Sequence, residues 1–324
     1  MIWWITTQAT MLAPMFLVTN ELMLQNAMKS GVMGVFPSLN YRDEGQLGQV
    51  LDGLNAFKKD TPGNYGVNLI VQKANPFYEK HLAICIEKEV PFFITSLGNP
   101  KEVIEKAHAY GGKVFCDVVN LEHAKKCASY NCDGFIAVGQ GAGGHAGNNS
   151  LQVLIPALVK EFPNIPVVGA GGISSGAGLL SIQALGAIGA SIGTRFIASE
   201  EASVSKDYKN AIVKSGMKDI VLTERLSGTP CTIIETPYSK KIGYKQNWFE
   251  RLMNKNKKVR KYYKMLVQSK GMKKLEKSVK PGNYNNLWCA GQSVELISDV
   301  KSIDNIVQTI MKEHSEARKN LLDF

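Results

Sequence analysis

The sequence has little of what metal-binding and membrane proteins need. None of its six cysteines lies in a Cys-x-x-Cys pair, so neither a zinc ribbon nor a clustered iron–sulfur site is indicated, and scattered thiols are typical of a reducing cytosol. No run of about 18 uncharged apolar residues occurs. The start, MIWWITTQATML, has no basic residues before a very short apolar core. We therefore expect no signal peptide, no membrane span and a cytoplasmic protein.

Ionisable residues are also sparse where metal or glycoside chemistry would require them. No pair of carboxylates stands at the ends of the predicted strands. His81, His108, His123 and His314 fall within predicted helices, where surface or packing roles are favoured over catalysis. We predict no metal site.

The net charge of +10 is concentrated in one segment. Residues 239–280 contain 15 Lys and Arg against 2 Glu, and the rest of the chain is slightly acidic. Aromatic and aliphatic residues recur in this segment at near-helical spacing, so the simplest interpretation is a solvated helical face. A docking surface for an acidic partner, such as an acyl carrier protein or a phosphorylated substrate, is the alternative, and nucleic acid is the least favoured.

Short apolar runs alternate with helix-length amphipathic segments through the first 200 residues. The runs cover residues 10–15, 31–36, 65–71, 90–96, 113–119, 133–139, 165–172 and 189–196. Strands that are apolar on both faces and followed by helices form parallel sheets, and eight such units predict a closed (β/α)8 barrel. A doubly wound open sheet is the alternative, but its dinucleotide-binding form needs an early Gly-x-Gly-x-x-Gly, which is absent here.

A barrel places its active site at the carboxyl ends of the strands, with phosphate bound after strands seven and eight. The segment GAGGISSGAG follows the seventh run and contains Gly171 and Gly172, which let backbone N–H groups approach an anion. The segment IGTRF follows the eighth run, and its Gly193 and Thr194 can close the same cradle. Either loop alone could be a short turn, but the two together predict a phosphate site.

The remaining strand ends suggest what carries the phosphate. The amide of Asn68 suits the polar edge of a heterocycle, and residues 13–15 (Ala13, Pro14, Met15) suit its apolar plane. Gln140 opens the loop after the sixth run, and His145 follows within QGAGGHAGNNS. A flat ring anchored by one phosphate describes flavin mononucleotide (FMN) better than a sugar phosphate.

The chain resembles the nitronate monooxygenase family, formerly the 2-nitropropane dioxygenases, which also includes flavin-dependent enoyl-[acyl carrier protein] reductases. The motifs that carry the resemblance are, in order, APM, GVNL, QGAGGHAG, AGGISSGAG, GASIGTRF and AGQSVELI. They cover about residues 12–200 and 289–297 and leave most of the basic segment unmatched.

The resemblance implies a cofactor, a catalytic residue and a domain plan. FMN would lie across the barrel mouth with His145 beside its reactive face as the catalytic residue. The implied FMN contacts are Ala13, Pro14, Met15, Asn68, Gln140, Gly144, Gly171, Gly172, Gly193, Thr194, Gln292 and Ser293. The implied domains are an FMN-binding barrel (1–204), a basic, mainly helical lid (205–285) and a C-terminal segment that returns to the barrel (286–324).

Three functions fit these residues. The favoured one is FMN-dependent oxidation of a nitronate or nitroalkane by O2 to a carbonyl compound and nitrite. The alternative is an enoyl-thioester or quinone reductase that uses NAD(P)H as co-substrate, and the third is a flavin-binding module with little turnover. After the second run, where many members of the family have Gly-Gly, this chain has Pro37 and Ser38. Near the end of the fifth run, where some members have a basic residue, it has Asp117, whose negative charge would disfavour an anionic reduced flavin. A homodimer is left open.

Overall fold

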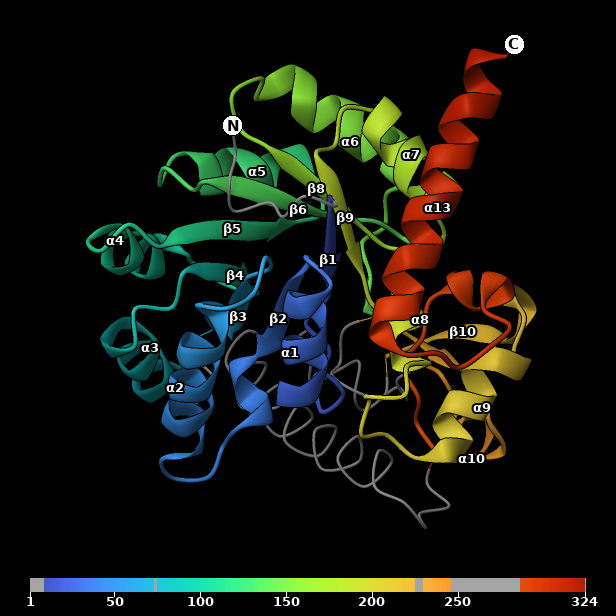
Figure 1. Ribbon diagram of the computed structural model, residues 1–324, viewed down its shortest axis with the longest axis horizontal. Helices are drawn as coiled ribbons and strands as arrows, with labels where there is room; N and C mark the ends of the chain where they lie inside the picture. Colours follow the sequence, from blue (N-terminus) through green and yellow to red (C-terminus); the bar gives the residue numbers. More distant parts are fainter. Residues whose placement is uncertain (1–8, 73–74, 225–229, 246–285, 324) are drawn as a thin grey trace.

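Eight parallel strands close into a barrel in chain order, in a computed structural model that describes residues 9–72, 75–224, 230–245 and 286–323 (Figure 1). Strand β9 closes the ring by pairing with β1. The strands are β1 (Thr10–Leu12), β2 (Met33–Pro37), β3 (Tyr65–Ile70), β4 (Phe92–Ser96), β5 (Lys113–Val118), β6 (Gly134–Val138), β8 (Val167–Ala170) and β9 (Gly189–Ile192). They coincide with the eight predicted runs, so the predicted (β/α)8 barrel is confirmed.

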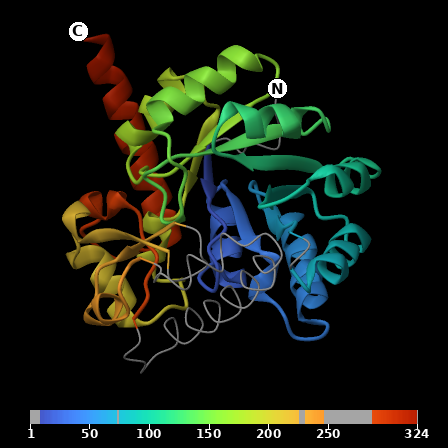
Figure 2. The ribbon, with the colours of Figure 1, turned by 180° about the vertical axis from the view of Figure 1, so that it is seen from behind.

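Helices carry the chain back between the strands and surround the barrel (Figures 1 and 2). They are α1 (Glu21–Lys29), α2 (Gln46–Lys58), α3 (Tyr78–Glu87), α4 (Lys101–His108), α5 (Leu121–Ala128), α6 (Leu151–Glu161), α7 (Gly176–Ala184) and α8 (Thr194–Ile197). Asn20 caps α1 by accepting a hydrogen bond from the Met23 N–H at 2.9 Å. Helix α8 is only one turn long. The C-terminal helix α13 (Ile303–Leu322) packs against α7 and α1 and covers the barrel between them.

The apolar residues of the barrel strands belong to two clusters, one on each face of the barrel wall. One cluster lies between strands and helices and includes helix residues such as Leu24 and Leu154. The other is built from strand residues alone and fills the barrel interior: Met11, Met33, Val35, Phe92, Ile94, Phe115, Ile136 and Val168. Because side chains alternate along a strand, a residue two positions beyond an interior residue also faces inward.

A small antiparallel sheet extends the barrel and was not predicted. Its order is β10 (Ile220–Thr223), β11 (Cys231–Ile234) and β7 (Gly144–His145), flanked by α9 (Lys206–Lys214) and α10 (Pro237–Ile242). The lid predicted for residues 205–285 therefore contains strands as well as helices in its described part. Residues 246–285, and with them most of the basic segment 239–280, lie outside the described residues. In the described part of the chain, no helix is long and apolar enough to cross a membrane.

Candidate functional site

The residues predicted to form the site gather at one end of the barrel, which we call the mouth. Ala13, Pro14 and Met15 follow β1, and Asn68 lies near the end of β3. The Gln140–His145 loop follows β6, while Gly171 and Gly172 follow β8 and Gly193 and Thr194 follow β9. All of these strands are parallel, so their carboxyl ends meet at this mouth.

The ends of β1 and β9 lie side by side. The Ala13 N–H donates to the Ile192 carbonyl at 2.9 Å. A Cβ placed on Gly193 would lie 3.6 Å from the Met15 sulfur and 3.7 Å from the Ala13 Cβ, which are ordinary contacts. The two segments predicted to hold opposite ends of one ligand are therefore neighbours.

Three glycine-rich segments meet at the mouth through their backbones. A Cβ on Gly291 would lie 2.4 Å from the Gly141 carbonyl oxygen, and one on Gly171 would lie 2.7 Å from the Ala142 nitrogen. Both distances are too short for a real side chain, so these positions require glycine. The loop after β6 is thus held between the loop after β8 and the C-terminal segment.

Two other glycines leave open space instead. Gly144 and Gly172 have φ values of 74° and 76°. A Cβ on Gly144 would meet nothing within 4 Å, and one on Gly172 would meet only the Gly141 Cα at 3.8 Å. These backbone positions are where a ligand can approach closely.

The C-terminal segment contacts the loops after β8 and β9. The Gly291 N–H donates to the Thr194 hydroxyl at 3.1 Å, and the Ser174 hydroxyl donates to the Ser293 carbonyl at 3.4 Å. Ser293 is buried and Gln292 is exposed. Both residues therefore lie beside the loops after β8 and β9.

The start of helix α7 is satisfied from within the chain. Its N-cap Ser175 accepts a hydrogen bond from the Gly178 N–H at 3.2 Å, and the Gly176 N–H donates to the Glu313 carboxylate of α13 at 2.8 Å. A carboxylate already occupies the place where this helix would attract an anion. The predicted phosphate cradle at Gly171, Gly172, Gly193 and Thr194 therefore gains no help from the start of α7.

His145 lies on a strand rather than in a free loop. It pairs with Cys231 in the antiparallel ladder between β7 and β11, and the Thr232 hydroxyl donates to the Ala142 carbonyl at 2.6 Å. The residue is exposed, yet desolvation by the surrounding protein lowers the pKa of its imidazole below the usual 6.5. An exposed side chain that is nevertheless desolvated is expected where it lines a hollow within the protein.

Asn68 belongs to a hydrogen-bonded row at the ends of β3, β4 and β5. Its Nδ2 donates to the Ile94 carbonyl at 3.2 Å and to the Ser96 hydroxyl at 2.7 Å. The Ser96 hydroxyl in turn donates to the Asp117 carboxylate at 2.5 Å. Ser96 was not predicted as a site residue, although a polar residue at the carboxyl end of the apolar strand FFITS could have indicated it.

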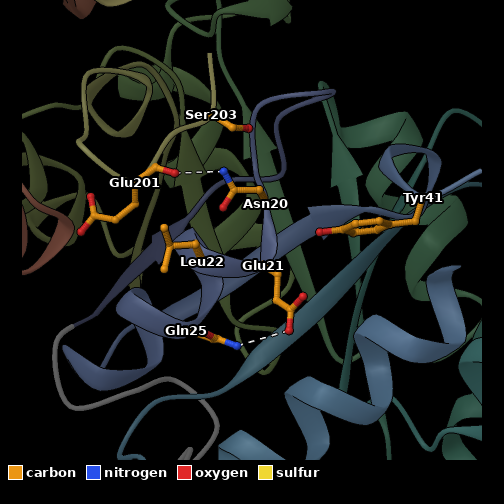
Figure 3. Close-up of a pocket in the computed structure, with 7 residues that line it drawn as sticks. All are labelled: Asn20, Glu21, Leu22, Gln25, Tyr41, Glu201 and Ser203. Atoms are coloured by element: carbon orange, nitrogen blue, oxygen red, sulfur yellow. Dashed lines mark hydrogen bonds between the residues drawn. The ribbon is translucent and has the colours of Figure 1, made fainter. Parts of the chain in front are cut away.

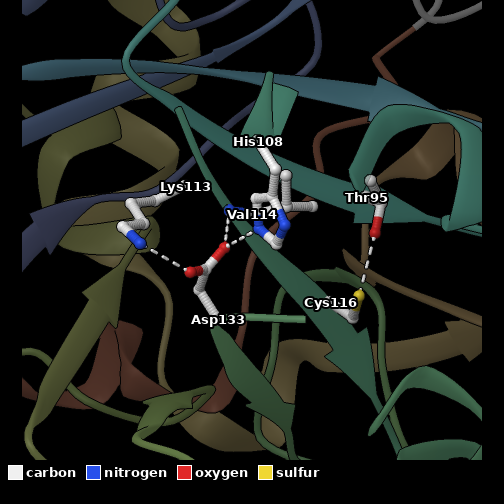
Figure 4. Close-up of polar contacts among 6 residues, drawn as sticks. All are labelled: Thr95, His108, Lys113, Val114, Cys116 and Asp133. Atoms are coloured by element: carbon white, nitrogen blue, oxygen red, sulfur yellow. Dashed lines mark hydrogen bonds and ion pairs between the residues drawn. The ribbon is translucent and has the colours of Figure 1, made fainter. Parts of the chain in front are cut away.

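The opposite, N-terminal end of the barrel carries a structural cluster around Asp133. Its carboxylate accepts from the Val114 N–H at 2.9 Å and lies 2.9 Å from the Lys113 Nζ and 2.7 Å from the His108 Nε2 (Figure 4). This cluster connects the start of β6 to β5 and α4, and His108 takes part in it as an exposed polar residue.

An open pocket at the rim of the barrel contains none of the predicted site residues (Figure 3). It is lined by Asn20, Glu21, Leu22, Gln25, Tyr41, Glu201 and Ser203. The Asn20 amide donates to the Glu201 carbonyl at 2.9 Å, which joins the two sides of the pocket. Its two carboxylates, with no Lys or Arg among the described residues that line it, make it a poor site for a phosphorylated ligand.

Comparison with known proteins agrees with the motif resemblance. The family model described as nitronate monooxygenase matches residues 46–313. The chain is 36% identical over 177 residues to a Staphylococcus saprophyticus protein named "Probable nitronate monooxygenase", covering 51% of this chain and 50% of that protein. It is 32% identical over 172 residues to a Rhodococcus jostii hydroxy-methyl-oxo-octahydroindene-carboxyl-CoA dehydrogenase, covering 53% of this chain and 48% of that one. The matched segment thus spans about half of each relative.

Solved structures match over nearly the whole chain. FabK from Thermotoga maritima superposes with a TM-score of 0.84 and 27% identity, covering 99% of this chain and 97% of that one. A nitroalkane oxidase from Streptomyces ansochromogenes gives a TM-score of 0.78 at 22% identity over 98% of each chain, which shows a shared fold.

Proposed function

Since the chain belongs to the nitronate monooxygenase family of flavin-dependent oxidoreductases, we propose that it binds FMN at the barrel mouth and acts on an acyl thioester. The open backbone at Gly172 follows β8, and Gly193 and Thr194 follow the adjacent strand β9; together these segments suit one phosphate group. Met15 and Ala13, in contact range of Gly193, suit the apolar plane of the ring. Asn68, Gln140, Gln292 and Ser293 remain proposed contacts of the ring edge.

The neutral state of His145 is the observation that favours a thioester over a nitronate as substrate. When bound, the flavin supplies hydride transfer to or from a substrate carbon. The lowered pKa keeps His145 uncharged at neutral pH, so it can donate a hydrogen bond to a thioester carbonyl but offers no positive charge to a nitronate. Arg195, near the mouth, is already paired with Asp299 at 2.6 Å. A neutral substrate therefore fits the described residues better than an anion.

Oxidation of a nitronate is the second candidate. It is favoured by the matching family model and by the Staphylococcus saprophyticus relative, which has the higher identity of the two curated relatives compared above. The name of the Rhodococcus jostii relative, a dehydrogenase of a CoA thioester, supports the first candidate. Docking of an acidic carrier protein on the segment 239–280 remains a prediction.

Anaerobic mixing of the purified flavoprotein separates the candidates. We expect NADH or NADPH to bleach the flavin absorbance and crotonyl-CoA to restore it, or a saturated acyl-CoA to bleach it directly. Bleaching by propionate 3-nitronate and by none of the others would contradict the thioester proposal and support nitronate oxidation. A flavin that none of these compounds bleaches would indicate a binding module.

A further inference from the structure

Asn68, Ser96 and Asp117 form a polar row directly above the apolar barrel interior. They lie near the carboxyl ends of the adjacent strands β3, β4 and β5. Ser96 and Asp117 come two residues after Ile94 and Phe115, which belong to the interior cluster, so they face the same interior. Asn68 also faces inward, since its two sequence neighbours pack toward the helices.

The hydrogen bonds in this row run in one direction and end at the carboxylate. The Asn68 amide donates to Ser96, and Ser96 donates to Asp117. Ser96 is the one hydrogen-bond partner of Asp117 in the described part of the chain, and the Asp117 side chain keeps partial exposure. The Asp117 carboxyl is therefore held by one hydrogen bond, and its oxygens can form further hydrogen bonds with a ligand at the mouth.

Among the residues that the structure describes, no ion pair explains the presence of the acidic Asp117 in the barrel wall. It is the single acidic residue in the eight barrel strands, and the single basic one, Lys113, is paired with Asp133 at the other end. The flanking strands β4 and β6 contain no acidic or basic residue, and α4 turns an apolar face to β5. His123 and Cys127 of α5 lie on the outer face of β5, beside Cys116 rather than Asp117.

This setting places the titration of Asp117 near neutral pH. Desolvation raises the pKa of its carboxyl to about 6, and the Ser96 hydrogen bond acts in the opposite direction. His145, on β7, is the other ionisable side chain that we place at the mouth. The pKa of His145 is lowered while that of Asp117 is raised, so desolvation disfavours the charged form of both groups.

We propose that Asp117 exchanges a proton with the substrate at the mouth, with Ser96 and Asn68 as its positioning residues. The inference rests on the proposed function. In the reduction of an enoyl thioester, a bound reduced flavin would supply hydride to the β-carbon, and the double-bond electron pair would shift to the α-carbon. The Asp117 carboxylic acid gives its proton to that α-carbon and is left as a carboxylate, which a solvent proton restores. In the reverse direction, dehydrogenation, the Asp117 carboxylate would remove the α-proton while a bound oxidised flavin would accept the hydride from the β-carbon.

The same group selects among substrates by charge. Above its pKa, ionised Asp117 repels a nitronate anion and leaves the binding of a neutral thioester unaffected. Asp117→Asn should therefore tighten the binding of ethylnitronate at about pH 8 by roughly tenfold, a change of about 1.4 kcal/mol. Binding of crotonyl-pantetheine, which is uncharged, should change little.

The direct test follows the Asp117 carboxyl by NMR in full-length protein with carbon-13-labelled aspartate. In FMN-free protein we expect one carboxyl that titrates near pH 6, is absent in Asp117→Asn and moves to higher pH in Ser96→Ala. Adding FMN should raise its pKa further, because the ligand displaces water. The matched control is Asp133→Asn, which makes the same substitution at the opposite end of the barrel and should leave this titration unchanged.

Two results would overturn the assignment. One is the absence of any Asp117-dependent carboxyl titrating near pH 6. The other is a combined result: the Asp117 titration is identical with and without FMN, and the affinity for ethylnitronate is the same in Asp117→Asn as in the wild type. That result would show that the carboxyl is purely structural. If FMN fails to bind at all, the proposed function fails, and the titrations of the FMN-free wild type and Ser96→Ala still decide whether Asp117 ionises at the mouth.

Discussion

His145 owes its position to backbone pairing and its chemistry to desolvation. The ladder with Cys231 fixes its strand, and the lowered pKa keeps its imidazole neutral, with one nitrogen able to donate and the other to accept. A neutral imidazole beside a reacting carbonyl can polarise it through a hydrogen bond. The sequence motif places His145 in the loop after the sixth barrel strand, but the protonation state of His145 depends on the surrounding fold.

Replacing His145 tests this role. His145→Ala should leave FMN bound while turnover falls by roughly two to four orders of magnitude, as expected for a positioned proton donor or acceptor. The measurement is steady-state turnover together with the flavin absorbance of the purified variant. His314→Ala serves as the control, because His314 bonds Gln183 on the outer helices at 2.7 Å and should keep full turnover. Unchanged turnover in His145→Ala would leave that residue as a structural part of the turn.

At the scale of elements, strand β11 holds the loop after β6 against the barrel. The Thr232 hydroxyl donates to the Ala142 carbonyl at 2.6 Å and reaches the Gly144 carbonyl at 3.4 Å. The small sheet therefore belongs to the functional site as well as to the lid, because its third strand carries His145.

Thr232→Val removes this tie and keeps the side-chain shape. The loss of one hydrogen bond, worth about 1 kcal/mol, should lower turnover by roughly three- to tenfold with FMN content unchanged. Thr309→Val on the exposed face of α13 is the matched control, and its turnover should equal that of the wild type. Equal kinetics for both variants would show that β7 keeps its place without Thr232.

The barrel elements could be read from the sequence, whereas the small sheet could not. Each barrel strand is a continuous apolar run followed by a helix, and several of these helices have a capping Asn or Ser, so every unit carries its own local signal. Strand β7 is two residues long and pairs with β11, which lies more than 80 residues away. Such a pairing depends on contacts between distant segments and has no periodic signature.

The same distinction holds for the site. The parallel-barrel rule brings Gly172, Gly193 and His145 to one mouth because each follows a recognisable strand. The contact of Glu313 with the start of α7 arises between segments 137 residues apart in sequence, which no local pattern predicts. The position of Asp117 was noted as a departure from the family, but its raised pKa depends on burial that only the fold reveals.

For the molecule as a whole, the desolvated carboxyl of Asp117 implies a cost in stability at neutral pH. The pKa of Asp117 is about 6 in the folded protein and near 3.8 when unfolded, so the folded state binds this proton more tightly. The group therefore favours folding fully below about pH 4, and this contribution is lost as the pH rises through 6. At neutral pH the wild type holds a desolvated negative charge at the mouth.

Asp117→Asn should accordingly stabilise the protein at high pH. We expect a gain in the free energy of unfolding of at most about 3 kcal/mol at pH 8, shrinking toward zero near pH 4. Urea denaturation at several pH values measures it. Asp133→Asn should instead lower stability at neutral pH, because it removes a carboxylate bonded to Lys113, His108 and the Val114 N–H. A variant Asp117→Asn that is less stable than wild type at pH 8 would contradict the assigned pKa.

The FMN content of two matched glycine variants tests most directly whether the mouth is the cofactor site. Gly172 and Gly45 have φ values of 76° and 74°, and neither has a neighbour within 3.5 Å of an added Cβ, so Gly172→Asp and Gly45→Asp impose similar backbone strain. Only the first adds bulk and negative charge to the proposed phosphate cradle. We expect folded Gly45→Asp to purify with a full complement of FMN and folded Gly172→Asp to purify without it. A Gly172→Asp variant that retains all of its FMN would contradict the placement of the cofactor at the mouth.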